Sequence, residues 1–189
     1  MAFTVNSMTM AIGATMHTFE IQLADVDRGV YVDLSLRAAQ HPSETDAYLV
    51  TRVLAYCLEY EEGIAFSAGG VSTGEEPAIL VKDLTGLITA WIEVGAPDAQ
   101  RLHTGSKRAG RTAVYTHRDP AKLLASWRGK TIHQSEQIMV RSFDPKFVDA
   151  ATQKLTRRNT MSVSVTEGQI YLELNGTSLE TQISSHGIE

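Results

Sequence analysis

The chain has 189 residues, of which 43% are hydrophobic and 21% charged, which fits a single soluble globular domain with its own core. It contains no run of about 18 apolar residues, which excludes a membrane-spanning helix. Its net charge of −5 argues against a protein that coats nucleic acid. Its one cysteine, Cys57, excludes an internal disulfide and a cysteine-based zinc site.

The charges are unevenly distributed along the sequence. Residues Met1–Asp98 contain 4 Lys/Arg against 14 Asp/Glu, a net charge of −10, whereas Ala99–Glu189 contain 13 against 8, a net charge of +5. This asymmetry indicates an acidic cluster that faces a basic surface. The alternative is that the charges lie separately on solvated faces of the protein.

The N-terminal residues differ in character from the rest of the chain. Residues 1–13 carry no basic residue, and Asn6-Ser7 interrupts their apolar run, so they do not make a convincing signal peptide. We expect a disordered N-terminal extension over residues 1–13 and a single domain over residues 14–189. The expected location of the protein is the cytoplasm.

The first elements after this extension are a hairpin and a helix. His17–Leu36 alternates apolar and polar residues around a turn at Asp25–Gly29, which predicts the hairpin. The helix is expected to begin with Ser43 as its N-cap, to carry Glu44 in its first turn and to end at Gly63. Its apolar residues recur at helical spacing and must pack on another element, most simply a sheet. They are Leu49, Val50, Val53, Leu54, Cys57 and Leu58.

The remaining sequence alternates short apolar strands with helices. The expected strands are Ile64–Ser67, Ile79–Val81, Leu87–Val94, Thr112–His117, Gln137–Ser142, Met161–Val165, Gln169–Leu174 and Thr177–Ile183, and the expected helices are Ala99–Gly110, Ala121–Arg128 and Pro145–Leu155. Gly105 and Gly110 weaken the first of these helices, because each costs about 1 kcal/mol relative to alanine.

This order of elements predicts an α/β (α+β) fold. We expect a mixed β-sheet flanked by helices, with antiparallel hairpins at both ends of the chain. The central strands of the sheet are expected to be Leu87–Val94 and Thr112–His117.

Two acidic residues lie beside strands in the middle of the chain. Glu76 comes just before the strand Ile79–Val81, and Glu93 lies within the apolar run Leu87–Val94. Two carboxylates at the ends of neighbouring strands can hold a hard divalent cation through oxygen ligands. Each acid taken singly is more simply a solvent-exposed residue. Solvent exposure explains Glu93 less well, because a carboxylate on an interior strand must be paired, metal-bound or protonated.

A basic stretch follows these acids. From Arg101 to Arg118 there are five Lys/Arg and no Asp or Glu. Cations on a helix in this stretch can hold a phosphate, and a metal together with a phosphate is the minimum requirement of a phosphodiester-cleaving site. The alternative is a basic helix that faces solvent.

Several motifs, in order along the chain, resemble those of the YaeQ family. They are Ala24–Arg28, His41–Thr45, Glu75–Pro77, Trp91–Asp98 and Gly168–Leu172, and the resemblance spans His17 to Leu179. The family resembles an offshoot of the PD-(D/E)XK nuclease-like fold, which is the restriction-endonuclease-like core. This resemblance implies an acid on the first helix, one on the hairpin strand, a Glu-x-Lys pair on the next strand, and then a helix.

The resemblance assigns positions of this sequence to that pattern. The first-helix acid is Glu44, the hairpin acid is Glu76 with Glu75 as a less favoured substitute, and the acid of Glu-x-Lys is Glu93. The lysine position falls on Gly95, which is a departure from the pattern. Strand alternation places residue 95 on the same face as Glu93, so the missing amine leaves a hole on the active side.

The next helix can supply the missing cation, from Lys107 or Arg101. Lys107 is the preferred analogue because it is the sole lysine of the segment, whereas an arginine stabilises charge but cannot act as a base near neutral pH. On the first helix, Arg52 lies two turns after Glu44 and can reach back to hold a carboxylate of the site. The alternative for Arg52 is a helix-surface cation of little energetic consequence.

Together these assignments imply a nuclease-like protein. Its catalytic set is Glu44, Glu76, Glu93, Lys107 and Arg101. Glu76 and Glu93 would hold Mg²⁺ or Mn²⁺, which would activate water for phosphodiester hydrolysis on nucleic acid. The alternative is a non-catalytic binding or regulatory module with a degenerate site, which Gly95 favours. The expected partners are nucleic acid or another phosphate-bearing ligand, and no membrane.

Overall fold

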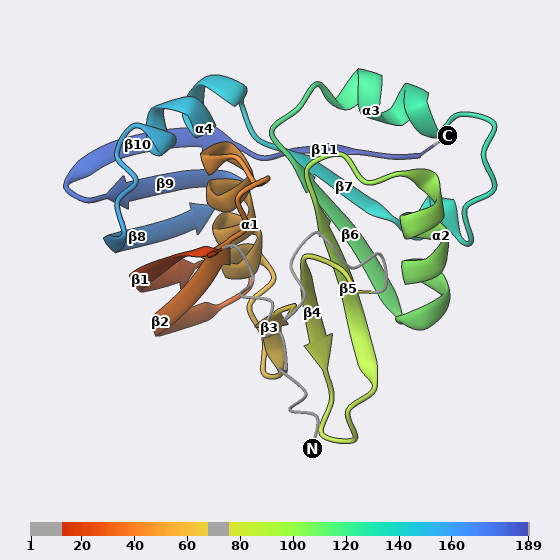
Figure 1. Cartoon of the computed structure of the whole chain (residues 1–189), viewed down its shortest axis with the longest axis horizontal. Coiled ribbons are helices and arrows are strands. Elements are labelled where there is room, and N and C mark those ends of the chain that lie inside the picture. The colour runs from red at the N-terminus through yellow and green to blue at the C-terminus, as the bar shows by residue number, and fades with distance from the viewer. Residues whose placement is uncertain (1–12, 68–75, 189) are drawn as a thin grey trace, which may run out of the picture.

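The computed structural model describes residues 13–67 and 76–188 of the chain. Two β-sheets stand side by side with helix α1 (Asp46–Leu58) between them, as Figure 1 shows. The predicted class, mixed sheet and flanking helices, is confirmed, but the strands form two mixed sheets and not one. Residues 1–12, nearly all of the predicted N-terminal extension, lie outside the described residues.

The first sheet, sheet A, contains five strands in the order β10-β9-β8-β1-β2. Their bounds are β1 (Thr15–Asp25), β2 (Val30–Gln40), β8 (Arg158–Thr166), β9 (Gln169–Leu174) and β10 (Thr177–Gln182). β1 pairs in parallel with β8 and so joins the two predicted hairpins. Antiparallel hairpins do lie at both ends of the chain, as predicted, and together they form a sheet of their own. A lone hairpin is marginally stable, whereas five strands share one apolar face.

The second sheet, sheet B, contains six strands in the order β11-β7-β6-β5-β4-β3. Their bounds are β3 (Ile64–Phe66), β4 (Ile79–Lys82), β5 (Ile88–Val94), β6 (Arg111–Thr116), β7 (Met139–Ser142) and β11 (Ser184–His186). β5 and β6 are central, as predicted. β3, β4 and β5 form an antiparallel meander, and β5, β6 and β7 run parallel. The short strand β11 was not predicted, because its three residues carry no apolar alternation.

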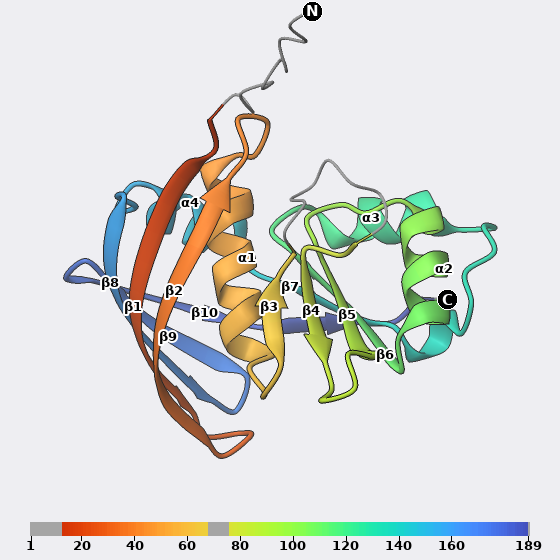
Figure 2. The ribbon, with the colours of Figure 1, turned by 60° about the horizontal axis from the view of Figure 1, so that its bottom comes forward.

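Helices lie on both faces of sheet B. α2 (Ala99–Arg108) and α3 (Pro120–Trp127) cover the face opposite α1, as Figure 2 shows. Leu102, Val114 and Trp127 form part of a core cluster between them. α4 (Pro145–Thr152) packs on α1 and β10. A single 3₁₀ turn, Ser135–Gln137, precedes β7. In the described part of the chain, no helix is long and apolar enough to cross a membrane.

Helix α1 is buried on all sides because a sheet lies against each of its flanks. Its ten residues Leu49–Leu58 are all buried, polar ones included. The helix is capped by Thr45, whose hydroxyl accepts the Tyr48 N–H at 3.1 Å. The predicted N-cap, Ser43, is wrong because its hydroxyl is engaged 2.7 Å from the ring of His41. Glu44 therefore precedes the helix and does not lie in its first turn.

Gly105 allows α2 to approach β5 closely. A Cβ built on Gly105 would lie 2.5 Å from Cδ1 of Trp91, which is shorter than any ordinary contact. The helix ends at Arg108, so Gly110 lies outside it and only Gly105 lies within. Gly105 is present because the Trp91 ring occupies the space of a side chain. The glycine that weakens the sequence signal for a helix is thus required by packing.

Gly105→Ala tests this close approach. The substitution should gain about 1 kcal/mol in helix propensity but lose about 1–3 kcal/mol from overpacking against Trp91. We expect a net loss in the free energy of unfolding, measured by urea denaturation. Gly110→Ala is the matched control, because a Cβ there would make an ordinary contact of 3.6 Å. Equal stability of the two variants would contradict the packing role of Gly105.

Candidate functional site

The predicted acid Glu93 and the predicted cation Arg101 meet at the carboxyl edge of sheet B. In sheets with parallel strands, ligand sites form outside the carboxyl ends of the strands. A cavity of about 290 Å³ opens at this edge. Its lining residues are Tyr48, Glu93, Val94, Gly95, Ala96, Pro97, Arg101 and Arg118. They come from α1, the end of β5, the start of α2 and the residues after β6.

Glu93 is 3% exposed, and both of its carboxylate oxygens accept N–H donors. Trp91 Nε1 donates to Oε1 at 2.8 Å, Arg101 Nε donates to Oε1 at 3.1 Å, and Arg101 Nη2 donates to Oε2 at 3.2 Å. Burial raises the pKa of the Glu93 carboxyl, while the charge and hydrogen bonds of Arg101 and the hydrogen bond from Trp91 oppose that rise. The charge of Glu93 therefore depends on Arg101.

Helix α2 fixes the position of Arg101. Asp98 caps the helix, and its carboxylate accepts the Arg101 N–H at 2.8 Å, so Arg101 lies in the first turn beside the end of β5. Its Nη2 also donates to the carbonyl oxygen of Glu76 at 2.8 Å. The guanidinium thus connects β5, α2 and the segment before β4, and 21% of the side chain remains exposed.

Gly95 occupies the position where the related pattern has its lysine. Its φ is +83°, and a Cβ there would lie 3.3 Å from Cδ2 of Tyr48. Glu93, in contrast, faces α2 through Arg101. The positive φ ends the strand alternation, so alternation cannot be used to place residue 95 on the same face as Glu93, although both residues line the cavity. A lysine at this position would be strained and would not replace Arg101.

Glu44 and Arg52 form a second ion pair, on the α1 side of the sheet. Arg52 Nη2 lies 3.2 Å from Glu44 Oε2 and donates to the carbonyl oxygen of Ala39 at 2.6 Å. The contact lacks hydrogen-bond geometry, and both Glu44 oxygens are buried without a hydrogen bond. Burial raises the pKa of Glu44, and Arg52 opposes this. Arg52 thus does reach back to a carboxylate, and that carboxylate is Glu44.

Tyr48 lies between the two ion pairs. Its ring centroid is 5.8 Å from the Arg52 guanidinium carbon, and its ring also contacts the position of Gly95. Burial raises the pKa of the Tyr48 phenol; the charges of Glu44 and Glu93 add to this, and those of Arg52 and Arg101 oppose it. The phenol is therefore neutral, and Tyr48 is one of the residues that line the cavity.

The structure does not bring Lys107 or the Glu76 side chain into this cavity. Lys107 lies exposed in the last turn of α2, two turns from Arg101, and the cavity lining includes neither residue. Only the carbonyl of Glu76 contacts the site. Glu75, the less favoured substitute, lies outside the described residues.

A metal held by Glu76 and Glu93 would have to compete with contacts that Glu93 already makes. In residues 13–67 and 76–188, no group of three His, Cys, Asp or Glu is placed to hold an ion. Arg101 and Trp91 take both oxygens of Glu93, and Glu44 is paired separately with Arg52. A hard cation needs several oxygen ligands together.

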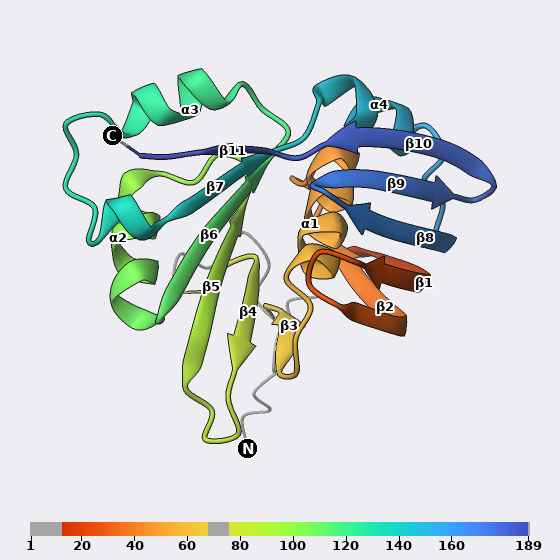
Figure 3. The same ribbon diagram turned by 180° about the vertical axis from the view of Figure 1, so that it is seen from behind.

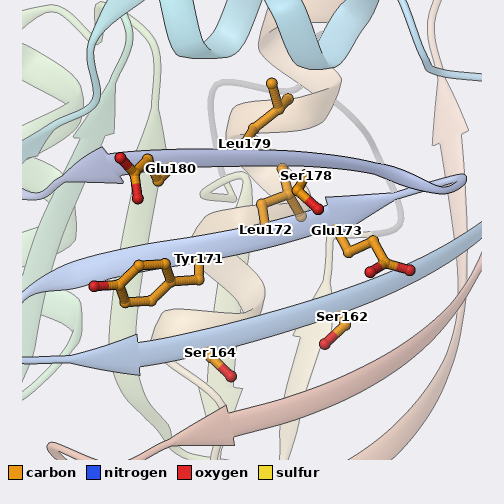
Figure 4. A pocket seen from close by; sticks show the side chains of 8 residues that line it. All are labelled: Ser162, Ser164, Tyr171, Leu172, Glu173, Ser178, Leu179 and Glu180. Atoms are coloured by element: carbon orange, nitrogen blue, oxygen red, sulfur yellow. The ribbon is translucent and has the colours of Figure 1, made fainter.

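A larger hollow, of about 530 Å³, lies on the outer face of sheet A, as Figure 4 shows. Its lining residues are Ser162, Ser164, Tyr171, Leu172, Glu173, Ser178, Leu179 and Glu180. None of the predicted site residues belongs to it. Its two carboxylates, with no basic residue in the lining, would repel a phosphate, so the smaller cavity beside Arg101 is the better candidate for an anionic ligand.

Sequence reasoning gave Tyr48 and Trp91 no role in the site, and it named Arg118 only as the end of the basic stretch. Trp91 was treated as an apolar residue of its strand, and Tyr48 was not considered, although both carry a polar group that needs a partner or water when buried. Trp91 and Glu93 lie two apart on one strand face, a spacing that could have indicated their hydrogen bond. The basic stretch did not indicate that Arg118 lies beside Glu93, because only the parallel pairing of β5 and β6 brings the two residues to the same cavity.

The fold and site together define a two-sheet α+β protein with a buried arginine–carboxylate pair at the carboxyl edge of its parallel strands. The family model described as YaeQ protein matches residues 10–183. The chain belongs to the YaeQ family, which confirms the resemblance seen in the sequence.

Bacterial relatives align with most of the chain. It is 29% identical over 180 residues to the uncharacterized protein YaeQ of Escherichia coli (strain K12), covering 93% of this chain and 97% of that protein. The crystal structure of YaeQ protein from Xanthomonas axonopodis pv. citri matches with a TM-score of 0.82 and 28% identity, over 93% of this chain and 99% of that one. The YaeQ structure from Pseudomonas syringae matches with a TM-score of 0.82 and 29% identity, over 93% and 97%.

Arg101→Ala should make stability strongly dependent on pH. Without the guanidinium, the buried Glu93 carboxyl has a folded-state pKa above its unfolded value of about 4.3. The free energy of unfolding of the variant is therefore closest to that of wild type below about pH 4.3, where the carboxyl is protonated in both states. It falls as pH rises through the folded-state pKa. We expect a loss of about 2 kcal/mol at pH 8 and a smaller loss at pH 5, measured by urea denaturation against wild type.

The double variant Glu93→Gln/Arg101→Ala is the control for this prediction. It keeps the shape of the side chain at residue 93 but has no titrating carboxyl there. Its stability difference from wild type should change less between pH 5 and pH 8 than that of Arg101→Ala. The same pH dependence in both variants would contradict the coupling of Arg101 to Glu93.

Gly95→Lys should destabilise the protein without restoring a functional lysine. A left-handed conformation costs a residue with a Cβ about 1–2 kcal/mol, and the contact with Tyr48 adds to this. Gly95→Asn is the control, because asparagine tolerates this conformation better. We expect the lysine variant to lose more stability than the asparagine variant in thermal unfolding. A lysine variant as stable as wild type would show that residue 95 is not constrained.

Proposed function

We propose that the protein has a PD-(D/E)XK nuclease-like core and that this core binds a phosphate-bearing ligand, such as nucleic acid, without cleaving it. The order α1-β3-β4-β5-α2-β6 supports the nuclease-like core. In it an antiparallel meander is followed by a helix and a parallel strand. Glu93 lies on the third strand of the meander, where the nuclease-like pattern has its acidic residue.

The observation that supports this proposal most directly is that Arg101 binds the carboxylate of Glu93. The guanidinium contacts both carboxylate oxygens, and the usual lysine position is a glycine with a positive φ. The carboxylate is therefore used to hold a cation of the protein itself. Such a pair orients the arginine for a ligand, because a fixed guanidinium loses less freedom on binding.

Arg118 lies at the solvent-exposed side of the proposed phosphate site. Its side chain is exposed and lines the same cavity as Arg101. In the described part of the chain, its guanidinium makes no ion pair, so its donors are available to phosphate oxygens. Tyr48 adds a neutral hydroxyl at the same cavity. A basic lining with one compensated carboxylate suits an anion better than a free metal ion.

A second candidate function is phosphodiester hydrolysis that depends on Mg²⁺ or Mn²⁺. The placement of Glu93 within the nuclease-like order of elements favours it, as do the two buried Glu44 oxygens that accept no hydrogen bond. Hydrolysis requires Glu93 to give up its contacts with Arg101 and bind a metal, and the metal requires further oxygen ligands.

We also propose a cytoplasmic location, with which the free, buried Cys57 is compatible.

Binding of a fluorescent oligonucleotide, measured by anisotropy, tests the proposed phosphate site. Arg118→Ala should weaken binding roughly tenfold and reduce the dependence on salt by about one charge. Arg128→Ala removes an exposed arginine outside the cavity and is the matched control. Equal binding by both variants, or no binding by the wild type, would contradict the proposal.

A titration with Mn²⁺ separates the two candidate functions. The binding module is expected to take up no Mn²⁺ at this site and to leave the oligonucleotide intact. Mn²⁺ uptake that Glu93→Gln abolishes, together with cleavage of the oligonucleotide, would support hydrolysis in place of simple binding.

A further inference from the structure

The strand β2 forms one edge of sheet A and is unusually long for an edge strand. It has 11 residues and pairs with β1 along its whole length without a bulge. Among the described residues, no strand pairs with its other side. Figures 1 and 3 show β2 as the outermost strand of the sheet, on the side away from β10. A row of backbone donors and acceptors is therefore available at this edge.

The pairing of β1 determines which residues of β2 face the edge. The N–H of Thr18 donates to Arg157, which leads into β8, so the even-numbered residues of β1 bond towards β8 and the odd-numbered ones towards β2. The odd-numbered residues of β1 pair with even-numbered residues of β2. The free N–H and C=O groups consequently belong to the other set, namely Tyr31, Asp33, Ser35 and Arg37. The carbonyl of Ala39 also faces this way and binds Arg52.

β2 lacks the features by which proteins usually block an edge strand. Its sequence, Val-Tyr-Val-Asp-Leu-Ser-Leu-Arg-Ala-Ala-Gln, contains no proline and no lysine, and no charged side chain points to the core. Four apolar residues of its core face are only partly buried: Val30, Val32, Leu34 and Leu36. On the outer face, Tyr31 is 66% exposed. Such an edge is a template for pairing with another strand.

The charges of β2 are complementary to those of a second copy of the same strand. We propose that β2 pairs antiparallel with β2 of a second copy, about a two-fold axis at Ser35, and joins the two A sheets into one. Asp33 then lies opposite Arg37 of the second copy, and Arg37 lies opposite Asp33 of the second copy. Neither residue makes an ion pair among the described residues. A two-fold interface repeats each favourable pair.

The backbone geometry agrees with this register. Asp33, Ser35 and Arg37 are the residues whose N–H and C=O groups face the edge, so each opposed pair exchanges two hydrogen bonds, or about six in all. On the core face, Leu34 lies opposite Leu36 of the second copy. The two leucines belong to the partly buried set, and pairing covers them further.

Other registers lose the charge complementarity. A shift by two residues in one direction places Asp33 opposite Ser35 and Arg37 opposite Tyr31. The opposite shift places Asp33 opposite Ala39 and Arg37 opposite Ser35. A shift by one residue would place edge-facing groups against groups already bonded to β1. The register centred on Ser35 is therefore the one that the sequence of β2 specifies.

Charge reversal tests the proposed pairing. By sedimentation velocity over a range of concentrations, the wild type should form a dimer. Asp33→Arg or Arg37→Asp alone creates two like-charge pairs and should weaken the dimer roughly tenfold. The double variant Asp33→Arg/Arg37→Asp restores opposite charges and should regain most of the affinity. Single and double variants with equal affinity would overturn the assigned register.

Ser35→Pro tests the strand pairing itself. The proline removes an N–H that faces the edge and leaves the bonds between β1 and β2 intact, so the variant should fold but remain monomeric. Ser35→Ala is the matched control, because it keeps the N–H and should dimerise like wild type; circular dichroism checks that both fold. A wild-type protein that stays monomeric, or a dimer that survives Ser35→Pro, would overturn the proposal.

Discussion

The burial of α1 between the two sheets is the constraint on which the rest of the structure depends. A surface helix sends its polar residues to water, but α1 has no free side, and its residues from Leu49 to Leu58 are all buried. Every polar group on it therefore needs a partner inside the protein. Thr51 donates to the Ala47 carbonyl and contacts His117, and Arg52 has Glu44 and Ala39.

The same constraint places a charged group at each end of the helix. At the N-terminal end, Arg52 and Glu44 lie beside the candidate site. At the C-terminal end, Glu59 accepts hydrogen bonds from Tyr115 and Arg111 of β6. These contacts connect α1 to sheet B at one end and, through Ala39, to sheet A at the other. The candidate cavity lies at the N-terminal end, where both sheets contribute to holding Arg52 and Tyr48.

The sequence was sufficient for most of the order of elements and for placing a cation of α2 near Glu93, because both follow from local patterns and a short connection between β5 and α2. It preferred Lys107, whereas the cation that contacts Glu93 is Arg101. It was not sufficient for the second sheet. The pairing of β1 with β8 joins residues as far apart in sequence as Thr18 and Arg158, and alternation within each strand carries no information on its partner. Glu44 was misplaced for a local reason, since the contact of Ser43 with His41 removes the expected cap.

The pairing of β1 with β8 also has a consequence for the synthesis of the chain. The hairpin of β1 and β2 is complete early, yet β8 leaves the ribosome only when most of the protein has been made. Until then the inner face of β1, with Phe19, Ile21 and Leu23, cannot be buried as it is in the finished sheet. Contacts of such long range form slowly, and the exposed apolar surface is prone to aggregate. The hairpin can pack early only on α1, whose residues share its core cluster, and its sheet is completed when the C-terminal strands are made.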